Sequence, residues 1–340
     1  MTSNASRSES PIRPATAHRI VQYAFLLFFA YVGARFFAYA MWALGETETF
    51  VSRPPSVEAF LPIGALVGLK RLLLTGNYDP IHPAGLTIMI MALVTAFLFR
   101  KGFCGYLCPV GAISGVLHRL GKRLAIVRPL PRFVSVLLTV PKYLLLAFFV
   151  KIVLIDIPPM GLESFIRTEY YRVADTKMLL FFMPPSLTVV VILAALVLGS
   201  LLIPSFWCRG FCPYGALLGL FSMLSPTAVR RDKESCIHCR RCTGACPSRI
   251  TVHVRERISG PECVGCGECV SACPVPGCLN FGLGWGKRFQ TLPALFPAVG
   301  MLFAVFLFYF WASASGHWHN NLPLEMIRRD HLQIRSMQHP

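Results

Sequence analysis

The chain has 340 residues, of which 54% are hydrophobic and 14% are charged. A soluble domain usually carries about 25% charged residues, so the composition excludes a disordered chain, a collagen-like chain and an ordinary soluble enzyme. The net charge of +17 suits nucleic acid or a membrane surface. The 13 cysteines favour a metal framework over a secreted disulfide scaffold, which would be shorter and more polar.

Five apolar segments are long enough, or nearly so, to cross a hydrocarbon core about 30 Å thick as helices. They are residues 20–44, 84–99, 133–157, 187–203 and 292–312. The run 59–69 is too short to span and predicts an interfacial or re-entrant piece. Residues 1–19 predict a disordered tail, and the long apolar run behind them argues against a cleaved secretory signal. The sequence therefore predicts an α-helical integral membrane protein with about five transmembrane helices.

The positive charges predict the orientation of these helices. With the N-terminus inside, the inside segments 1–19, 100–142 and 205–290 carry 22 Lys and Arg residues, and the outside segments carry 9. Because cytoplasmic loops are enriched in Lys and Arg, we expect the N-terminus inside and the C-terminus outside. Topology then accounts for most of the net charge, and no nucleic-acid partner is expected.

Eight cysteines form two copies of the pattern C-x2-C-x2-C-x3-C-P, which is the spacing of bacterial ferredoxins with two clusters. Three cysteines of each run surround one [4Fe–4S] cluster, and the fourth reaches the other cluster. Cluster I is assigned Cys236, Cys239, Cys242 and Cys273. Cluster II is assigned Cys246, Cys263, Cys266 and Cys269. Zinc is the alternative, but its sites use four ligands in all. Cys278 is either a spare buried thiol or a replacement ligand.

The other four cysteines form a second repeat. Cys104 and Cys108 follow the second apolar segment, and Cys208 and Cys212 follow the fourth, each pair in a C-x3-C-P-x-G-A motif. The chain therefore contains two helix-pair units, and repeated units often share a site at their interface. Cysteines four apart are expected on one helical face. The four thiols could bind a further metal or cluster, form a redox-active dithiol, or serve close packing.

Residues 80–280 resemble the NapH/NosR/YccM-type membrane-bound polyferredoxins. The resemblance is carried by Arg100-Lys-Gly-Phe-Cys104 with Cys108-Pro, by Trp207-Cys208 with Cys212-Pro-Tyr-Gly-Ala-Leu-Leu, and by both ferredoxin runs. The fifth helix is similar to the YccM-like branch. The resemblance implies a protein of the bacterial inner membrane that passes electrons between the quinone pool and a partner redox protein. A Ser-Gly-Ala-Thr flavin-attachment motif is absent, so no FMN is expected.

Three residues are candidates for a quinone site. Ionisable side chains inside a membrane are costly and often functional, which singles out Arg35 and Lys151. His82, just before the second apolar segment, could accept a quinol proton because an unperturbed imidazole titrates near pH 6.5. Each has a structural alternative: Arg35 in an ion pair, Lys151 paired with Asp156, and His82 at the helix entry.

The expected organisation is a cytoplasmic tail (1–19), a four-helix membrane domain (20–228), an α+β ferredoxin domain on the cytoplasmic side (229–290), a fifth transmembrane helix (291–313) and a periplasmic tail (314–340). The leading functional hypothesis is electron transfer with the quinone pool, as a carrier or as the quinol-oxidising subunit of a larger system. The alternative is an assembly factor that reduces a metal such as copper, or thiols, for a partner membrane enzyme.

Overall fold

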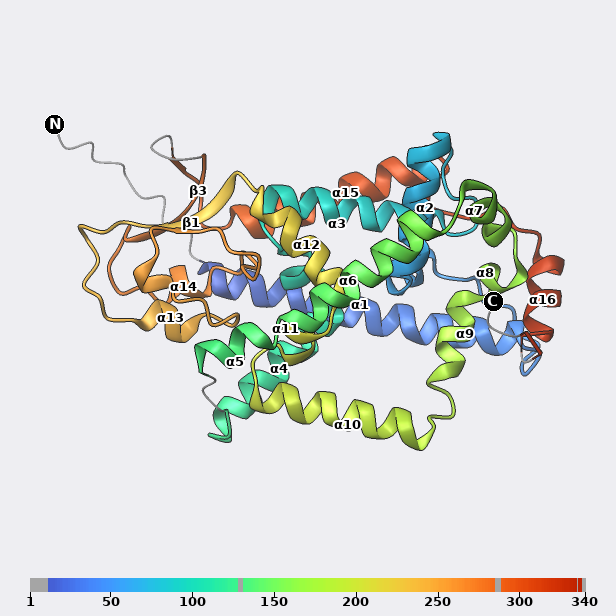
Figure 1. The fold of residues 1–340 in the computed structure, drawn as a ribbon, viewed down its shortest axis with the longest axis horizontal. Helices are drawn as coiled ribbons and strands as arrows, with labels where there is room; N and C mark the ends of the chain where they lie inside the picture. Colours follow the sequence, from blue (N-terminus) through green and yellow to red (C-terminus); the bar gives the residue numbers. More distant parts are fainter. Residues whose placement is uncertain (1–11, 128–130, 285–288, 335, 338–340) are drawn as a thin grey trace.

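The computed structural model describes residues 12–127, 131–284, 289–334 and 336–337, and these are mostly helical. A bundle of helices carries a small four-stranded sheet with its loops at one end and the helices α7, α8, α9 and α16 at the other (Figure 1). We call these the cysteine end and the distal end. All 13 cysteines lie in the cysteine end or in the helix turns next to it.

Within the described part of the chain, three helical stretches are long and apolar enough to cross a membrane: α1 (Pro14–Ala43), Phe133–Asp156 and α15 (Phe296–Ala314). The middle stretch is assembled from α5 (Arg132–Leu137), α6 (Val140–Val150) and the π-helix η3 (Lys151–Asp156). The other two predicted spans form the shorter apolar helices α3 (Pro83–Phe99) and α10 (Leu187–Leu202). The predicted interfacial run overlaps η1 (Pro55–Phe60) and α2 (Pro62–Thr75).

The segment 1–19, predicted as a tail, includes the start of helix α1. Helix α1 already begins at Pro14, because the fixed φ and missing N–H of proline suit the first helical position. The backbone N–H of Ala15 donates to Ser271 Oγ at 3.0 Å, and Arg19 pairs with Glu268 at 2.9 Å. These contacts attach the start of α1 to the cysteine end. Residues 1–11 lie outside the described part of the chain.

The two repeat units pack on each other reciprocally. In the first unit α3 is followed by the π-helix η2 (Phe103–Leu107) and α4 (Pro109–Arg123), and in the second α10 is followed by α11 (Phe206–Gly210) and α12 (Pro213–Met223). Helix α10 packs on α4, and α12 packs on α3. The backbones of α4 and α10 approach so closely that a Cβ at Gly121 would lie 2.1 Å from the Leu201 carbonyl oxygen. Because a helix of each unit packs on a helix of the other, the two C-x3-C-P motifs are brought together.

The sheet at the cysteine end is antiparallel, with the strand order β2-β1-β3-β4. Its strands are β1 (Thr227–Arg231), β2 (Arg257–Ile258), β3 (Leu279–Leu283) and β4 (Gln290–Thr291). The short helices α13 (Arg241–Ala245), η4 (Val252–Val254) and α14 (Glu268–Ser271) lie in the connections. Val229 is opposite both Ile258 and Phe281, and these side chains share one core with Cys242 and Cys263. The sheet therefore supports the cysteine loops.

At the distal end, α7 (Pro159–Ile166), α8 (Glu169–Arg172) and α9 (Ala174–Phe181) precede α10, and α16 (Leu324–Leu332) follows α15. The Arg172 guanidinium pairs with the buried Asp330 carboxylate at 2.5 Å, which attaches α16 to α8. The segment 314–340, predicted as a tail, thus includes a packed helix.

Candidate functional site

The second set of four cysteines lines one cavity at the cysteine end. It consists of Cys263, Cys266 and Cys269 from the second run and Cys246 from the first, and the remaining lining is mainly apolar, with Val229, Ile250 and Ile258. The last cysteine of the first run therefore joins the other run's group.

The first set lines a second cavity, with Cys236, Cys239 and Cys242 from the first run and Cys273 from the second. Cys278 lines the same cavity. Its thiol is 2% exposed and donates to the Asp232 carbonyl oxygen at 3.7 Å, and burial raises its pKa to about 11. Cys278 is thus a protonated thiol beside the first group.

Both cysteine loops have the same unusual backbone. In each run the residues on either side of the second cysteine have positive φ. They are His238 (53°) and Arg240 (60°) in the first run and Gly265 (64°) and Gly267 (71°) in the second. Residues other than glycine rarely adopt this conformation. Its repetition at His238 and Arg240 shows that both loops curl around their cavities in the same way. Two such cradles, each with four thiols, fit two cubane clusters, which would supply one-electron carriers.

A site for a single ion is a different case. Over the described residues, no group of three or more His, Cys, Asp and Glu is arranged to hold one metal ion. The eight ferredoxin-type cysteines line two cavities in groups of four instead.

The four C-x3-C-P thiols meet where the two repeat units pack together. Burial raises the pKa of Cys208 to about 12, and the neighbouring Cys108 and Cys212 thiols contribute to the rise. The same two thiols also raise the pKa of Cys104. The expectation that each pair shares a helical face is wrong. Cys108 and Cys212 are N-caps of α4 and α12, while Cys104 lies in η2 and Cys208 in α11. The reason is the following proline, which cannot continue a helix and keeps the residue before it extended.

The first of these motifs touches the second ferredoxin loop directly. The Lys101 N–H donates to the Cys263 carbonyl oxygen at 3.2 Å, and the Tyr106 hydroxyl donates to the Gly265 carbonyl oxygen at 3.0 Å. Glycine at 105 is required, because a Cβ there would lie 2.9 Å from the Val264 carbonyl oxygen. The C-x3-C-P motif of Cys104 and Cys108 therefore lies directly beside the second ferredoxin loop. We call Cys104, Cys108, Cys208 and Cys212 the membrane-edge cysteines.

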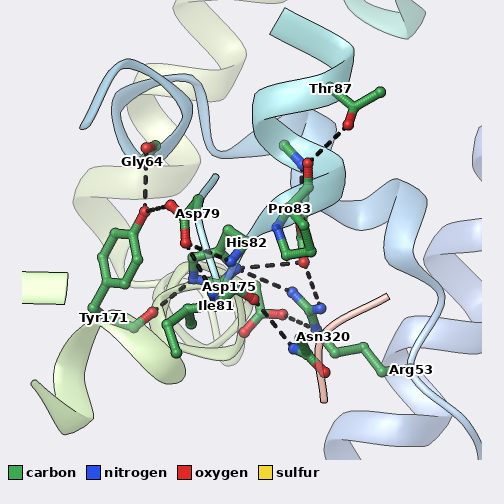
Figure 2. A network of polar contacts seen from close by, with 12 residues as sticks. Arg53, Gly64, Asp79, Ile81, His82, Pro83, Thr87, Tyr171, Asp175 and Asn320 are labelled. Atoms are coloured by element: carbon green, nitrogen blue, oxygen red, sulfur yellow. Dashed lines mark hydrogen bonds and ion pairs between the residues drawn. The ribbon is translucent and has the colours of Figure 1, made fainter. Parts of the chain in front are cut away.

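His82 lies far from these cysteines, at the distal end, within a buried ionic network (Figure 2). Arg53 pairs with Glu58 and with Asp175, each at 2.6 Å, and His82 Nδ1 is 3.5 Å from Glu58. His82 Nε2 donates to the Tyr171 carbonyl oxygen at 2.7 Å. Burial lowers the pKa of His82, but the hydrogen bond and charge of Glu58 outweigh burial and hold it above the usual value. The imidazole also lines an apolar cavity of about 690 Å³.

The other two quinone candidates are separate from His82. Arg35 donates to Ser52 Oγ at 3.3 Å on the exposed side of α1. Lys151 pairs with Asp156 at 2.6 Å, and both side chains are exposed. The π-helical turn makes residues five apart neighbours, so this pair is local to η3. The structure brings none of the three candidates into contact with another.

Comparison with known proteins agrees with the cysteine geometry. A family model described as a 4Fe-4S binding domain matches residues 81–127 and again 186–232, so each match contains one C-x3-C-P motif. A model described as a 4Fe-4S dicluster domain matches residues 228–274, which contain both ferredoxin runs. Over 298 residues the chain is 36% identical to YccM of Escherichia coli (strain K12), named for electron transport, with 84% of this chain and 80% of that protein covered. The chain belongs to the YccM-like family.

More distant relatives share part of the chain. NirI of Paracoccus denitrificans is 31% identical over 46% of this chain and 22% of its own length. MauN of Methylorubrum extorquens, named as a ferredoxin-type protein of methylamine utilization, is 30% identical over 48% of this chain and 54% of its own length. No solved structure matches. The YccM-like chain is thus an iron–sulfur electron transport protein, and its three long apolar helices suit membrane association.

Sequence reasoning missed two groups of residues in this YccM-like chain. One is the set of partners of His82, which are Arg53, Glu58 and Asp175. The other is a set of buried polar side chains near the C-x3-C-P motifs, including His18, Gln22, His118 and Arg209. The only available signal was their polar character beside apolar segments, which does not reveal contacts across the fold.

Proposed function

We propose that this protein passes electrons between the quinone pool and a partner redox protein through two [4Fe–4S] clusters. The observation that carries the proposal is the pair of cavities, each lined by three cysteines of one run and the last cysteine of the other. Cys236, Cys239, Cys242 and Cys273 hold cluster I. Cys246, Cys263, Cys266 and Cys269 hold cluster II.

The four C-x3-C-P cysteines are proposed to hold a further metal or iron–sulfur centre. Their thiols are close enough to affect one another's pKa, and the backbone N–H of Lys101 contacts the Cys263 carbonyl. The start of a helix favours negative charge, and Cys108 and Cys212 both occupy such starts. The order cluster I, cluster II, membrane-edge cysteines then leads from the sheet toward the bilayer.

The proposed location is the bacterial inner membrane, with residues 229–290 as a cytoplasmic ferredoxin domain between the membrane domain 20–228 and the fifth helix 291–313. The excess of Lys and Arg on the predicted inner segments supports this orientation. The distal end, with α16, would then face the periplasm.

The test is an anaerobic EPR redox titration with iron analysis, followed by addition of quinol. Two cubanes predict about eight iron atoms, plus any iron at the membrane-edge cysteines. The Cys246→Ala variant should lose the signal of cluster II, although Cys246 belongs to the first run; Cys278→Ala is the matched control and should keep both signals. Loss of cluster I from Cys246→Ala would refute the crossed assignment, and wild-type clusters that quinol never reduces would refute the link to the quinone pool.

Of the three candidates for an outer quinone site, one has a suitable space beside it. His82 lines the distal cavity of about 690 Å³, whereas Arg35 and Lys151 have local partners on exposed surfaces. A quinol oxidised there would be separated from Cys104 by the whole of α3, which is about 25 Å long at about 1.5 Å per residue. The distal site therefore requires a carrier inside the bundle. Slower reduction of the clusters by quinol in His82→Gln would support it.

A second candidate function is the reduction of copper or thiols for a partner membrane enzyme. It is favoured by one observation, that Cys104 and Cys208 line a cavity of about 370 Å³ next to the second ferredoxin loop. Under this function, purified protein with reduced clusters should reduce Cu(II), and the rate should fall when Cys104 and Cys208 are both replaced by serine. Unchanged copper reduction in that variant would exclude it.

A further inference from the structure

The cavity lined by Cys104 and Cys208 lies at the membrane edge of the cysteine end and is large enough for an aromatic ring. It has a volume of about 370 Å³ and is enclosed by α1, η2, α4, α11 and the ferredoxin loops. We call it the α1–α4 cavity. The residues that matter below are His18, Gln22, Cys104, Gly115, His118 and Arg209.

Four of the residues that line this cavity each have a buried polar atom without a partner in the described part of the chain: His18 Nδ1, Gln22 Oε1, His118 Nδ1 and Arg209 Nε. Each of these side chains is at most 7% exposed. A buried polar atom without a hydrogen bond costs about 1–3 kcal/mol. Four of them in the residues around one space make it suited to a polar ligand.

The hydrogen bonds of two of these residues define what they offer the ligand. His18 Nε2 and Gln22 Nε2 both contact the Gly105 carbonyl oxygen, at 3.0 and 2.9 Å. A carbonyl oxygen only accepts, so both nitrogens donate, and His18 Nδ1 and Gln22 Oε1 are left as acceptors. Arg209 Nε is a donor, held in place by the bond from its Nη2 to Ser135 Oγ at 2.7 Å. The cavity thus presents two acceptors and a donor.

The cavity also lies against a helix whose opposite face suits the membrane interface. Helix α4 exposes an apolar stripe at Val110, Ile113, Val116 and Leu120, at the three- and four-residue spacing of one helical face. Its other face carries Gly115 and His118 over the cavity. A helix of this kind lies in the membrane interface. The cavity is therefore at the depth where the polar ring of a membrane lipid-like molecule would lie.

We propose that the α1–α4 cavity binds the ring of a membrane quinone or quinol and is where the quinone pool exchanges electrons with this protein. The proposal rests on the proposed function and locates it. Hydroxyl groups of a quinol donate to His18 Nδ1 and Gln22 Oε1, and a quinone oxygen accepts from Arg209 Nε. Because Cys104, Cys208 and Val264 also line the cavity, the ring would lie beside the cysteines, and no electron would cross the bundle.

The chemistry balances with the groups that the protein holds. Oxidation of one quinol breaks two O–H bonds and releases two protons and two electrons. The two [4Fe–4S] clusters that the eight cysteines would hold would supply two one-electron acceptors. Burial and the charges of Lys122 and Arg249 lower the pKa of His118 to about 4. The imidazole is therefore neutral near pH 7 and quickly releases any proton that it accepts. The protons leave by way of the imidazoles to water, and reduction of quinone runs by the same steps reversed.

The decisive variant is Gly115→Leu, which fills the cavity from α4 without removing a polar group. A Cβ at Gly115 has only ordinary contacts, 3.6 Å from Arg119 Nη1 and 3.9 Å from Gln22 Oε1, so the helix should tolerate it. The matched control is Gly33→Leu in α1, where a Cβ has no atom within 4 Å. Binding of a fluorescent hydroxyquinoline N-oxide, a quinol analogue, is measured by quenching, and decylubiquinol-driven cluster reduction by stopped flow.

We expect Gly115→Leu to weaken analogue binding and slow reduction by decylubiquinol at least tenfold, with iron content and reduction by dithionite unchanged and Gly33→Leu like wild type. If Gly115→Leu loses iron, Gln22→Leu decides instead, and its analogue affinity should fall by a similar factor. Wild-type affinity in the deciding variant overturns the site; continued quinol reduction in that case leaves the proposed function standing. A wild-type protein that neither binds the analogue nor accepts electrons from quinol overturns both.

Discussion

At the scale of single residues, Glu262 joins the ferredoxin loops to the helices. Its carboxylate pairs with Lys101 at 3.7 Å and with the fully buried Lys142, and it directly precedes Cys263. Burial raises the pKa of Glu262, but the charges of the two lysines outweigh burial and hold it below the usual value. The carboxylate is therefore ionised at neutral pH and compensates two buried cations.

We predict that Glu262→Gln destabilises the protein by about 3–5 kcal/mol, because removal of one partner leaves a buried charge uncompensated. Thermal unfolding in detergent and hydrogen exchange of residues 260–270 measure the effect. The control is Glu256→Gln, which breaks the exposed pair with Lys233 and should change stability by less than about 1 kcal/mol. Equal effects of the two substitutions would contradict the role of Glu262.

His82 leads to a prediction about pH. Its pKa in the folded protein is raised by Glu58, so its contribution to stability is complete below the unfolded pKa of about 6.5 and is lost as the pH rises through the folded value. His82→Gln should therefore lower the unfolding temperature more at about pH 6 than at about pH 9. The exposed His319, replaced by Gln, is the control and should show no such dependence. A deficit that grows toward high pH would contradict the ionic role of His82.

At the scale of elements, the contact between α4 and α10 controls how the two repeat units meet. A Cβ at Gly121 would lie 2.1 Å from the Leu201 carbonyl oxygen, and a backbone atom cannot rotate away as a side chain could. Gly121→Ala should therefore separate the helices and cost about 1–3 kcal/mol, despite the better helix propensity of alanine. Gly33→Ala, in open surroundings, should be neutral or slightly stabilising. Thermal unfolding compares the two, and a neutral Gly121→Ala would show that α4 and α10 do not depend on this approach.

The elements also show what the sequence could and could not predict. The cysteine groups were predictable, because C-x2-C-x2-C spacing keeps three thiols near one another whatever the rest of the chain does. The local shape of the C-x3-C-P motifs was predicted wrongly, because the helical spacing of Cys104 and Cys108 mattered less than the break at Pro109. The start of α1 at Pro14 was missed because its first turn is stabilised by Ser271, which is distant in the sequence.

At the scale of the whole molecule, the polar sites depend on contacts that no local pattern reports. Arg53 reaches Asp175 across 122 positions, and the α1–α4 cavity combines Gln22, His118 and Arg209 from three helices. Apolar periodicity identifies helices, but it does not determine which polar faces will be enclosed together. The α1–α4 cavity and the distal cavity beside His82 therefore emerge only from contacts between segments that are distant in the sequence.

The orientation of the molecule in the membrane is a prediction that the fold makes testable at both ends. The 22 Lys and Arg of the predicted inner segments, against 9 outside, predict that the cysteine end lies in the cytoplasm, and the long helices would then carry α16 to the periplasm. Alkaline phosphatase, which is active only outside, should be active when fused after residue 334 and inactive when fused after residue 124, and a green fluorescent protein fusion should show the reverse. The physical reason is the same for both ends: an inverted protein would have to translocate the basic, cysteine-rich segment. Active phosphatase after residue 124 would reverse the orientation and would place the α1–α4 cavity at the periplasmic face.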